Sequence, residues 1–107
     1  MGLAAHQEEI IAQLYREMYR KLVVYAENAL NDSLAEEAVQ DTFRIACSKY
    51  DELMNSSNPQ GWLMNTLKNV IRNIRKEQAN LNKYFVMTMS LDDEEFMEIR
   101  AVGTDIH

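Results

Sequence analysis

Apolar side chains recur every three or four residues through three long segments of this chain, and short polar breaks separate these segments. This spacing places apolar residues along one side of an α-helix, whereas a half-buried β-strand needs strict alternation. Only three Gly and one Pro occur in 107 residues, so few positions interrupt a helix. The sequence therefore predicts an all-α fold, a compact bundle of three to four helices with an acidic C-terminal tail.

The predicted helices cover about residues 8–30, 33–54 and 59–82. Ser33, with a Glu three residues later, forms a capping box that predicts the start of the second helix. Asn58 is a favoured N-cap and Pro59 a favoured first helical residue, and together they predict the start of the third. The predicted apolar stripes are Ile11, Leu14, Met18, Leu22, Tyr25 and Ala29, then Val39, Phe43, Ala46, Tyr50 and Leu53, and finally Leu63, Leu67, Val70 and Ile74.

The C-terminal part of the chain follows a different pattern, in which a short apolar stretch precedes an acidic segment. Ser90 and Asp93 have the spacing of a capping box, which predicts a short acidic helix over about residues 91–100. We expect residues 1–83 to form one helical domain and residues 84–107 to act as an acidic linker or tail.

Positive charge is concentrated in one segment, although the whole chain has a net charge of -6. Residues 1–58 carry five Lys or Arg and ten Asp or Glu, and residues 84–107 carry one Arg and six acids. Between them, residues 59–83 carry five Lys or Arg and one Glu, a net charge of +4. Because the local field steers a polyanion, the third predicted helix is the candidate for contact with a nucleic acid.

Several classes of protein are disfavoured by the sequence. No apolar run approaches the ~18 residues of a membrane span, and residues 1–7 do not resemble the start of a secretory signal. Cys47 is the single Cys, and the two His lie at positions 6 and 107, so we expect neither an internal disulfide nor a metal site. We see no nucleophile paired with a base and no Gly-rich phosphate loop. We expect a cytoplasmic protein without cofactor, catalytic residues or membrane insertion, and not an enzyme.

One side of the third predicted helix carries amide and cationic side chains spaced three or four residues apart. Lys and Arg contact phosphates, and Asn can read base edges, so this side is a candidate surface for DNA. A solvated helix face is the simpler interpretation of the same pattern. The residues concerned are Asn65, Lys68, Asn69, Arg72 and Lys76, flanked by Asn73 and Arg75.

Two further features adjoin these residues. The polar loop Asn55, Ser56, Ser57 and Asn58 is either a simple turn or a pocket for an unstacked base. Trp62 is either part of the core, the usual place for a Trp beside a Leu stripe, or an aromatic surface against which a base stacks. The second predicted helix also has a polar stripe, either solvated or a charged docking surface for a protein. This stripe consists of Glu37, Gln40, Asp41 and Arg44.

Three segments together resemble region 2 of bacterial RNA polymerase sigma factors of the extracytoplasmic-function (ECF) type. They are AEEAVQDTF over residues 35–43, NPQGWL over residues 58–63 and NVIRN over residues 69–73. In that family an acidic helix with a Q-[ED]-[TV]-F ending is followed by a variable loop and then by N-P-x-x-W-L leading into a basic helix. The resemblance extends over about residues 10–83, and Glu37, Ala38 and Lys68 depart from the family pattern.

The resemblance implies a helical domain that docks on polymerase core and helps to start transcription. Glu37, Gln40, Asp41 and Arg44 would contact the clamp helices of the beta-prime subunit. The loop Asn55 to Asn58 would hold a flipped base of the minus-ten promoter element. Lys68, Asn69, Arg72, Arg75 and Lys76 would hold the melted non-template strand. An anti-sigma factor is a further implied partner, and the tail resembles the acidic linker before the second family domain.

A second function fits the same residues, namely an acidic helical module that binds proteins and never touches DNA. The negative net charge and the acidic tail favour it. A salt-dependent affinity for single-stranded promoter DNA would separate the two functions.

Overall fold

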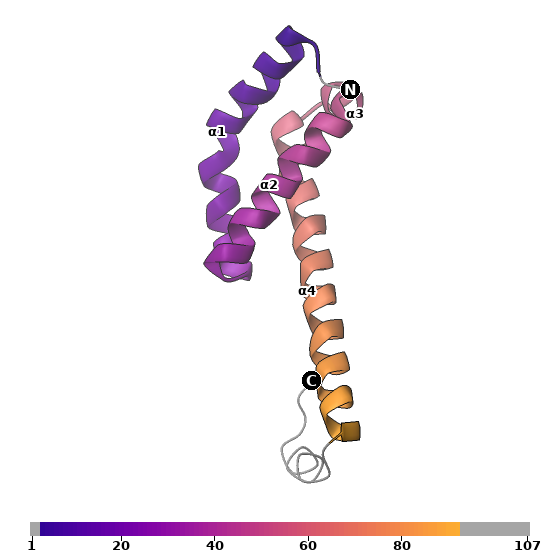
Figure 1. The fold of residues 1–107 in the computed structure, drawn as a ribbon. Coiled ribbons are helices and arrows are strands. Elements are labelled where there is room, and N and C mark those ends of the chain that lie inside the picture. Colours follow the sequence, from indigo (N-terminus) through magenta and orange to yellow (C-terminus); the bar gives the residue numbers. More distant parts are fainter. Residues whose placement is uncertain (1–2, 93–107) are drawn as a thin grey trace. The chain divides into compact units, whose positions relative to one another are not determined.

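The structure is a computed structural model, which describes residues 3–92, with side chains described as far as residue 85. Four helices make up almost all of this part, and no strand occurs within it (Figure 1). The predicted all-α fold is therefore confirmed. The helices are α1 (Ala5–Ala29), α2 (Asp32–Ser48), α3 (Tyr50–Asn55) and α4 (Pro59–Asp92).

The chain divides into two units, Met1–Arg72 and Asn73–His107. The first unit contains the core, because every fully buried large side chain among the described residues belongs to it. These side chains are Leu22, Val39, Thr42, Leu53, Leu63 and Leu67. In the second unit the described residues continue α4, and Leu81, Tyr84 and Phe85 are exposed. The predicted domain boundary at residue 83 stays a prediction.

α1 begins at Ala5, about three residues before the predicted start, and the Gln7 Oε1 atom accepts a hydrogen bond of 2.9 Å from the Ala4 N–H. The first four predicted stripe residues, from Ile11 to Leu22, are buried. The prediction is wrong at the end of the stripe, because Tyr25 is 40% exposed and Ala26 is buried instead. Both positions fit a spacing of three to four residues after Leu22, so the packing of neighbouring helices decides between them.

α1 packs against α2 through aromatic rings. The ring centroids of Tyr15 on α1 and Phe43 on α2 lie 4.8 Å apart, and within α1 the rings of Tyr15 and Tyr19 stack at 4.9 Å. Burial raises the pKa of the Tyr19 phenol, and the Tyr15 and Glu36 side chains act in the same direction. Glu36 of α2 therefore lies close enough to Tyr19 of α1 to influence its ionisation.

α2 begins one residue after Asn31, and the Oδ1 atom of Asn31 accepts a hydrogen bond of 2.9 Å from the Leu34 N–H. The prediction that Ser33 is the N-cap is therefore wrong. Asn and Ser cap helices about equally well, and two such residues stand within three positions here. Asn31 is the one that reaches a free backbone N–H of the first turn, which leaves Ser33 inside the helix.

Replacing Asn31 with Ala is expected to lower the free energy of unfolding by about 1 kcal/mol, because a backbone N–H at the start of α2 loses its acceptor. Replacing Ser33 with Ala should change it by less than about 0.5 kcal/mol, as expected for an exposed residue without such a role. Chemical denaturation followed by circular dichroism measures both values. A larger loss for the Ser33 variant would restore Ser33 as the cap.

The second predicted helix is interrupted at Lys49, whose φ of -114° and ψ of 43° are not helical. The chain resumes as the short helix α3, so the expectation of one helix to about Met54 is wrong. The predicted apolar stripe nevertheless stays buried on both sides of the interruption, from Val39 to Leu53. The break is invisible in the sequence because the spacing of apolar residues continues through it.

α4 begins as predicted, with Pro59 as its first residue and Asn58 as the N-cap. Its end differs, because the helix continues to Asp92, whereas we predicted an end at about residue 82. Ser90 therefore lies inside α4 and does not cap a separate helix. The remainder of the predicted acidic helix, residues 93–100, lies outside the described residues.

Within residues 3–92, no helix combines the length and the apolar character that crossing a bilayer requires.

Candidate functional site

The predicted DNA face of α4 lies on the surface of the first unit. Asn65, Lys68, Asn69 and Arg72 are all exposed, while Leu63, Leu67 and Val70 of the same helix are buried. Arg72 donates a hydrogen bond of 2.8 Å from its guanidinium to Asn69 Oδ1. The amide and the guanidinium are thus held together as one polar group, which presents donors to an anion.

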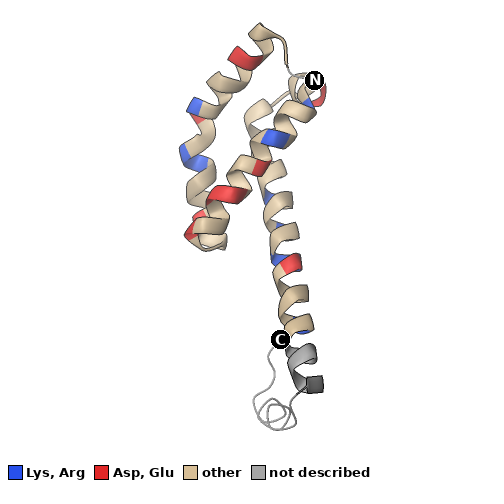
Figure 2. Ribbon diagram, in the orientation of Figure 1, with Lys and Arg blue, Asp and Glu red and all other residues tan. Residues whose placement is uncertain are grey.

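Lys68 and Arg72 are like charges one turn apart, an arrangement that weakens an isolated helix. Each has a different partner in the structure. Arg72 bonds to Asn69, and the Lys68 ammonium lies 5.6 Å from the centroid of the Tyr25 ring of α1. Figure 2 shows positive residues along both α1 and α4.

A second contact joins α1 to α4 further towards the start of α4. The Gln60 side-chain amide donates a hydrogen bond of 3.3 Å to Glu17 Oε1. Together with the contact between Lys68 and Tyr25, it shows that α1 lies beside the predicted DNA face of α4. Sequence reasoning missed this neighbourhood, because Tyr25 was assigned to the apolar stripe.

Arg75 and Lys76 continue the row of cations along α4, and both are exposed. Asn73 is exposed as well. These three residues belong to the second unit, which begins at Asn73.

The loop before α4 is shorter than predicted, because Asn55 is the last residue of α3. The Ser56 Oγ atom accepts a hydrogen bond of 3.1 Å from the Asn58 N–H. Asn58 Oδ1 in turn accepts a hydrogen bond of 3.1 Å from the Gly61 N–H. Ser56 and Asn58 therefore fix the backbone of the loop. Asn55 and Ser57 are exposed and have side chains suited to reading a base edge.

Gly61 leaves space for the cap of α4. A Cβ atom at this position would lie 2.6 Å from Asn58 Nδ2 and 3.0 Å from Asn58 Cγ. Any larger residue would push the Asn58 side chain away from the helix end that it caps. Gly61 therefore contributes to the start of α4 by leaving room for its N-cap.

Trp62 follows in the first turn of α4 and is half-buried, so it is neither part of the buried core nor freely exposed. Its carbonyl oxygen accepts a hydrogen bond of 2.8 Å from the Thr66 hydroxyl. The partly exposed indole lies one turn after Asn58, next in sequence to the loop. Its contact with a base stays a prediction.

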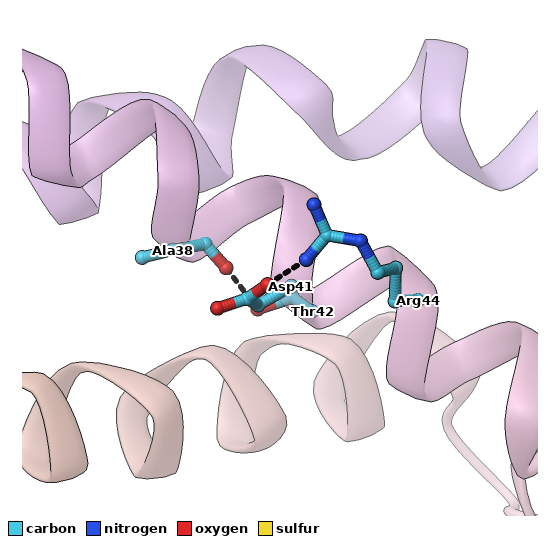
Figure 3. Close-up of polar contacts among 4 residues, drawn as sticks. All are labelled: Ala38, Asp41, Thr42 and Arg44. Atoms are coloured by element: carbon cyan, nitrogen blue, oxygen red, sulfur yellow. Dashed lines mark hydrogen bonds and ion pairs between the residues drawn. The ribbon is translucent and has the colours of Figure 1, made fainter.

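The polar stripe of α2 forms a separate surface. Glu37, Gln40 and Arg44 are exposed and Asp41 is half-buried. Arg44 donates a hydrogen bond from its guanidinium to the Asp41 carboxylate one turn earlier (Figure 3). The Thr42 hydroxyl is buried and donates to the Ala38 carbonyl oxygen at 2.9 Å. The surface thus offers carboxylates, an amide and one paired guanidinium to a protein partner.

Among residues 3–92, the structure brings together no group of three or more His, Cys, Asp and Glu side chains that could hold a metal ion. Comparison with models of known protein families, with curated proteins and with solved structures finds no significant match to this chain.

Proposed function

We propose that this chain is a sigma-factor domain that docks on the core of RNA polymerase and captures the melted minus-ten element of a promoter. The observation that carries the proposal is the pairing of two different surfaces in one helical unit. α4 presents exposed cations and amides directly after a polar loop, and α2 presents a more acidic surface. The resemblance of residues 35–43, 58–63 and 69–73 to region 2 of ECF sigma factors assigns DNA to the first surface and polymerase to the second.

The mechanism needs no catalytic group. Opening duplex DNA costs about 1.4 kcal/mol per base step in lost stacking. A protein offsets this cost if it binds the single strand better than the duplex, for example by holding an unstacked base and the phosphates beside it. The loop before α4 would take the base, through Asn55 and Ser57. Lys68 and Arg72 would hold the strand that follows.

The acidic surface of α2 gives the proposal its protein partner. A surface that carries Glu37 and Asp41 complements a basic patch on a partner and repels DNA. Its charge therefore favours one orientation of the domain, with α2 on the polymerase and α4 towards the promoter. The clamp helices of the beta-prime subunit are the partner that the family resemblance implies.

Replacing Asp41 with Lys is expected to weaken binding to core polymerase by at least about tenfold, equivalent to about 1.4 kcal/mol. The change reverses one charge of the proposed docking surface and also removes the partner of Arg44. Both side chains are partly exposed, so the pair itself contributes at most about 1 kcal/mol to folding. Fluorescence anisotropy of the labelled chain, titrated with core polymerase, measures the affinity.

Glu9 supplies a control, because it is exposed on α1 and Glu9→Lys changes the net charge by the same amount. This variant should bind polymerase as the wild type does. Equal affinities of the Asp41 and Glu9 variants would remove the α2 surface from the proposal.

The net charge of -6 favours the second candidate, an acidic module that binds proteins alone. That function predicts polymerase-independent protein contacts and no salt-dependent affinity for single-stranded DNA. The affinity of the chain for single-stranded DNA at several salt concentrations separates the two candidates.

A further inference from the structure

An aromatic side chain of α1 lies exposed beside the cationic face of α4. Tyr25 is 40% exposed, and the Lys68 ammonium lies 5.6 Å from its ring centroid. The neighbouring residues Leu22 and Ala26 are fully buried, so they, and not Tyr25, join α1 to the core. An exposed aromatic ring beside cations is the combination with which proteins bind single-stranded nucleic acid.

The two contacts between α1 and α4 show how these helices are aligned. Glu17 contacts Gln60, and Tyr25 contacts Lys68, so eight residues separate the two contacts in each helix. The helices therefore run side by side in the same direction over this stretch. Lys21 precedes Tyr25 by one turn and is exposed, and residues four apart share one side of a helix. α1 consequently adds an aromatic ring and a cation to the surface made by α4.

We propose that Tyr25 is a base-stacking residue for single-stranded DNA, and that a bound base displaces the Lys68 ammonium from the Tyr25 ring. This inference rests on the proposed function and adds a second helix to its DNA surface. In the free protein the Lys68 ammonium lies over the ring. In the complex a base takes that place on the ring, and the ammonium pairs with the phosphate beside the base. The exchange is favourable because a weak exposed cation–π contact is replaced by base stacking and a phosphate contact.

The exchange makes different predictions for the ring and for the ammonium. Removing the ring should weaken binding only where bases are present, and should leave the salt dependence unchanged. Removing the ammonium should weaken binding to any strand and reduce the salt slope by about 0.7, the share of one phosphate on a single strand. A purely structural role of Tyr25 would affect strands with and without bases equally.

The test uses the full chain and two fluorescent strands of equal length and charge, one of eight thymidines and one of eight abasic residues. Tyr25→Ala should bind the thymidine strand about 5- to 150-fold more weakly than the wild type, the usual effect of losing one stacked base. Its affinity for the abasic strand should stay within about twofold. Lys68→Ala should bind both strands more weakly.

Two control variants separate stacking from folding. Tyr25→Phe keeps the ring and should bind as the wild type does. Val24→Ala removes an adjacent side chain that is also exposed, and should bind normally too. Melting temperatures from circular dichroism show whether each variant is folded.

Three outcomes overturn the inference in distinguishable ways. Equal losses on both strands would mean that Tyr25 only positions Lys68. Unchanged affinity of Tyr25→Ala for thymidine, with salt-dependent binding by the wild type, would remove Tyr25 and leave the proposed function standing. A wild type that binds neither strand would overturn both the inference and the proposed function.

Discussion

Replacing Leu67 with Ala is expected to lower the free energy of unfolding by about 2–5 kcal/mol, because a fully buried Leu then leaves a cavity in the core. Leu67 is 0% exposed and lies on α4 opposite the cationic face. A loss of this size is a large share of the ~5–15 kcal/mol that holds a small domain folded. Urea denaturation followed by circular dichroism measures it.

Leu81 provides a matched control on the same helix. It is 65% exposed and belongs to the second unit, so Leu81→Ala should change the free energy of unfolding by less than about 0.5 kcal/mol. The same substitution in one helix thus has two very different expected costs. Equal losses at the two positions would contradict the assignment of the core to the first unit.

Replacing Asn55 with Ala is expected to cost about 1–3 kcal/mol in binding to a strand with the preferred base and little with other bases, because Asn55 is the exposed amide beside the loop. Replacing Arg72 with Ala is expected to weaken binding to all single strands about equally. It should also reduce the salt slope by about 0.7, because one phosphate contact is lost. Titration against short strands that differ at one position measures both effects.

Arg16 serves as the control for Arg72, because it is exposed on α1 and its removal changes the net charge equally. Arg16→Ala should leave both the affinity and the salt slope near the wild-type values. A uniform loss of affinity in the Asn55 variant, or a changed base preference in the Arg72 variant, would contradict the proposed roles of base recognition by the loop and phosphate binding by α4.

The start of α4 could be predicted from the sequence because its signals are local. Asn58 is a favoured N-cap and Pro59 a favoured first helical residue, and the structure uses both in that way. At α2 the same reasoning chose Ser33 although Asn31 is the cap, because two suitable residues stand close together. A local signal identifies a helix start only where one candidate reaches the free N–H groups.

The limits of the helices were harder to predict. The break at Lys49 leaves the apolar spacing of Val39 to Leu53 intact, so periodicity alone cannot reveal it. The end of α4 was predicted too early, because the apolar stripe becomes weak after Ile74. Gln, Ala, Asn and Lys dominate the residues that follow, and several of these are good helix formers even without an apolar stripe.

The exposed residues of the candidate site could be predicted because they lie on one helix. The contacts that join two helices at this site could not. Exposure of Lys68 and Arg72 follows from the burial of Leu67, Val70 and Ile71 on the other side of the helix. Their partners do not follow from the sequence. The contact between Lys68 and Tyr25 depends on the alignment of α1 with α4, and the role of Ser56 depends on the path of a short loop.

The preference of this chain for melted DNA is measured by comparing its affinity for a single strand with its affinity for the corresponding duplex at several salt concentrations. The proposed function predicts tighter binding to the single strand. It also predicts that log K falls with log salt with a slope of about -1.4 or steeper, because Lys68 and Arg72 would each contact one phosphate. Equal or tighter binding to the duplex, or affinity for the single strand that does not change with salt, would contradict the proposed function and favour the protein-binding module.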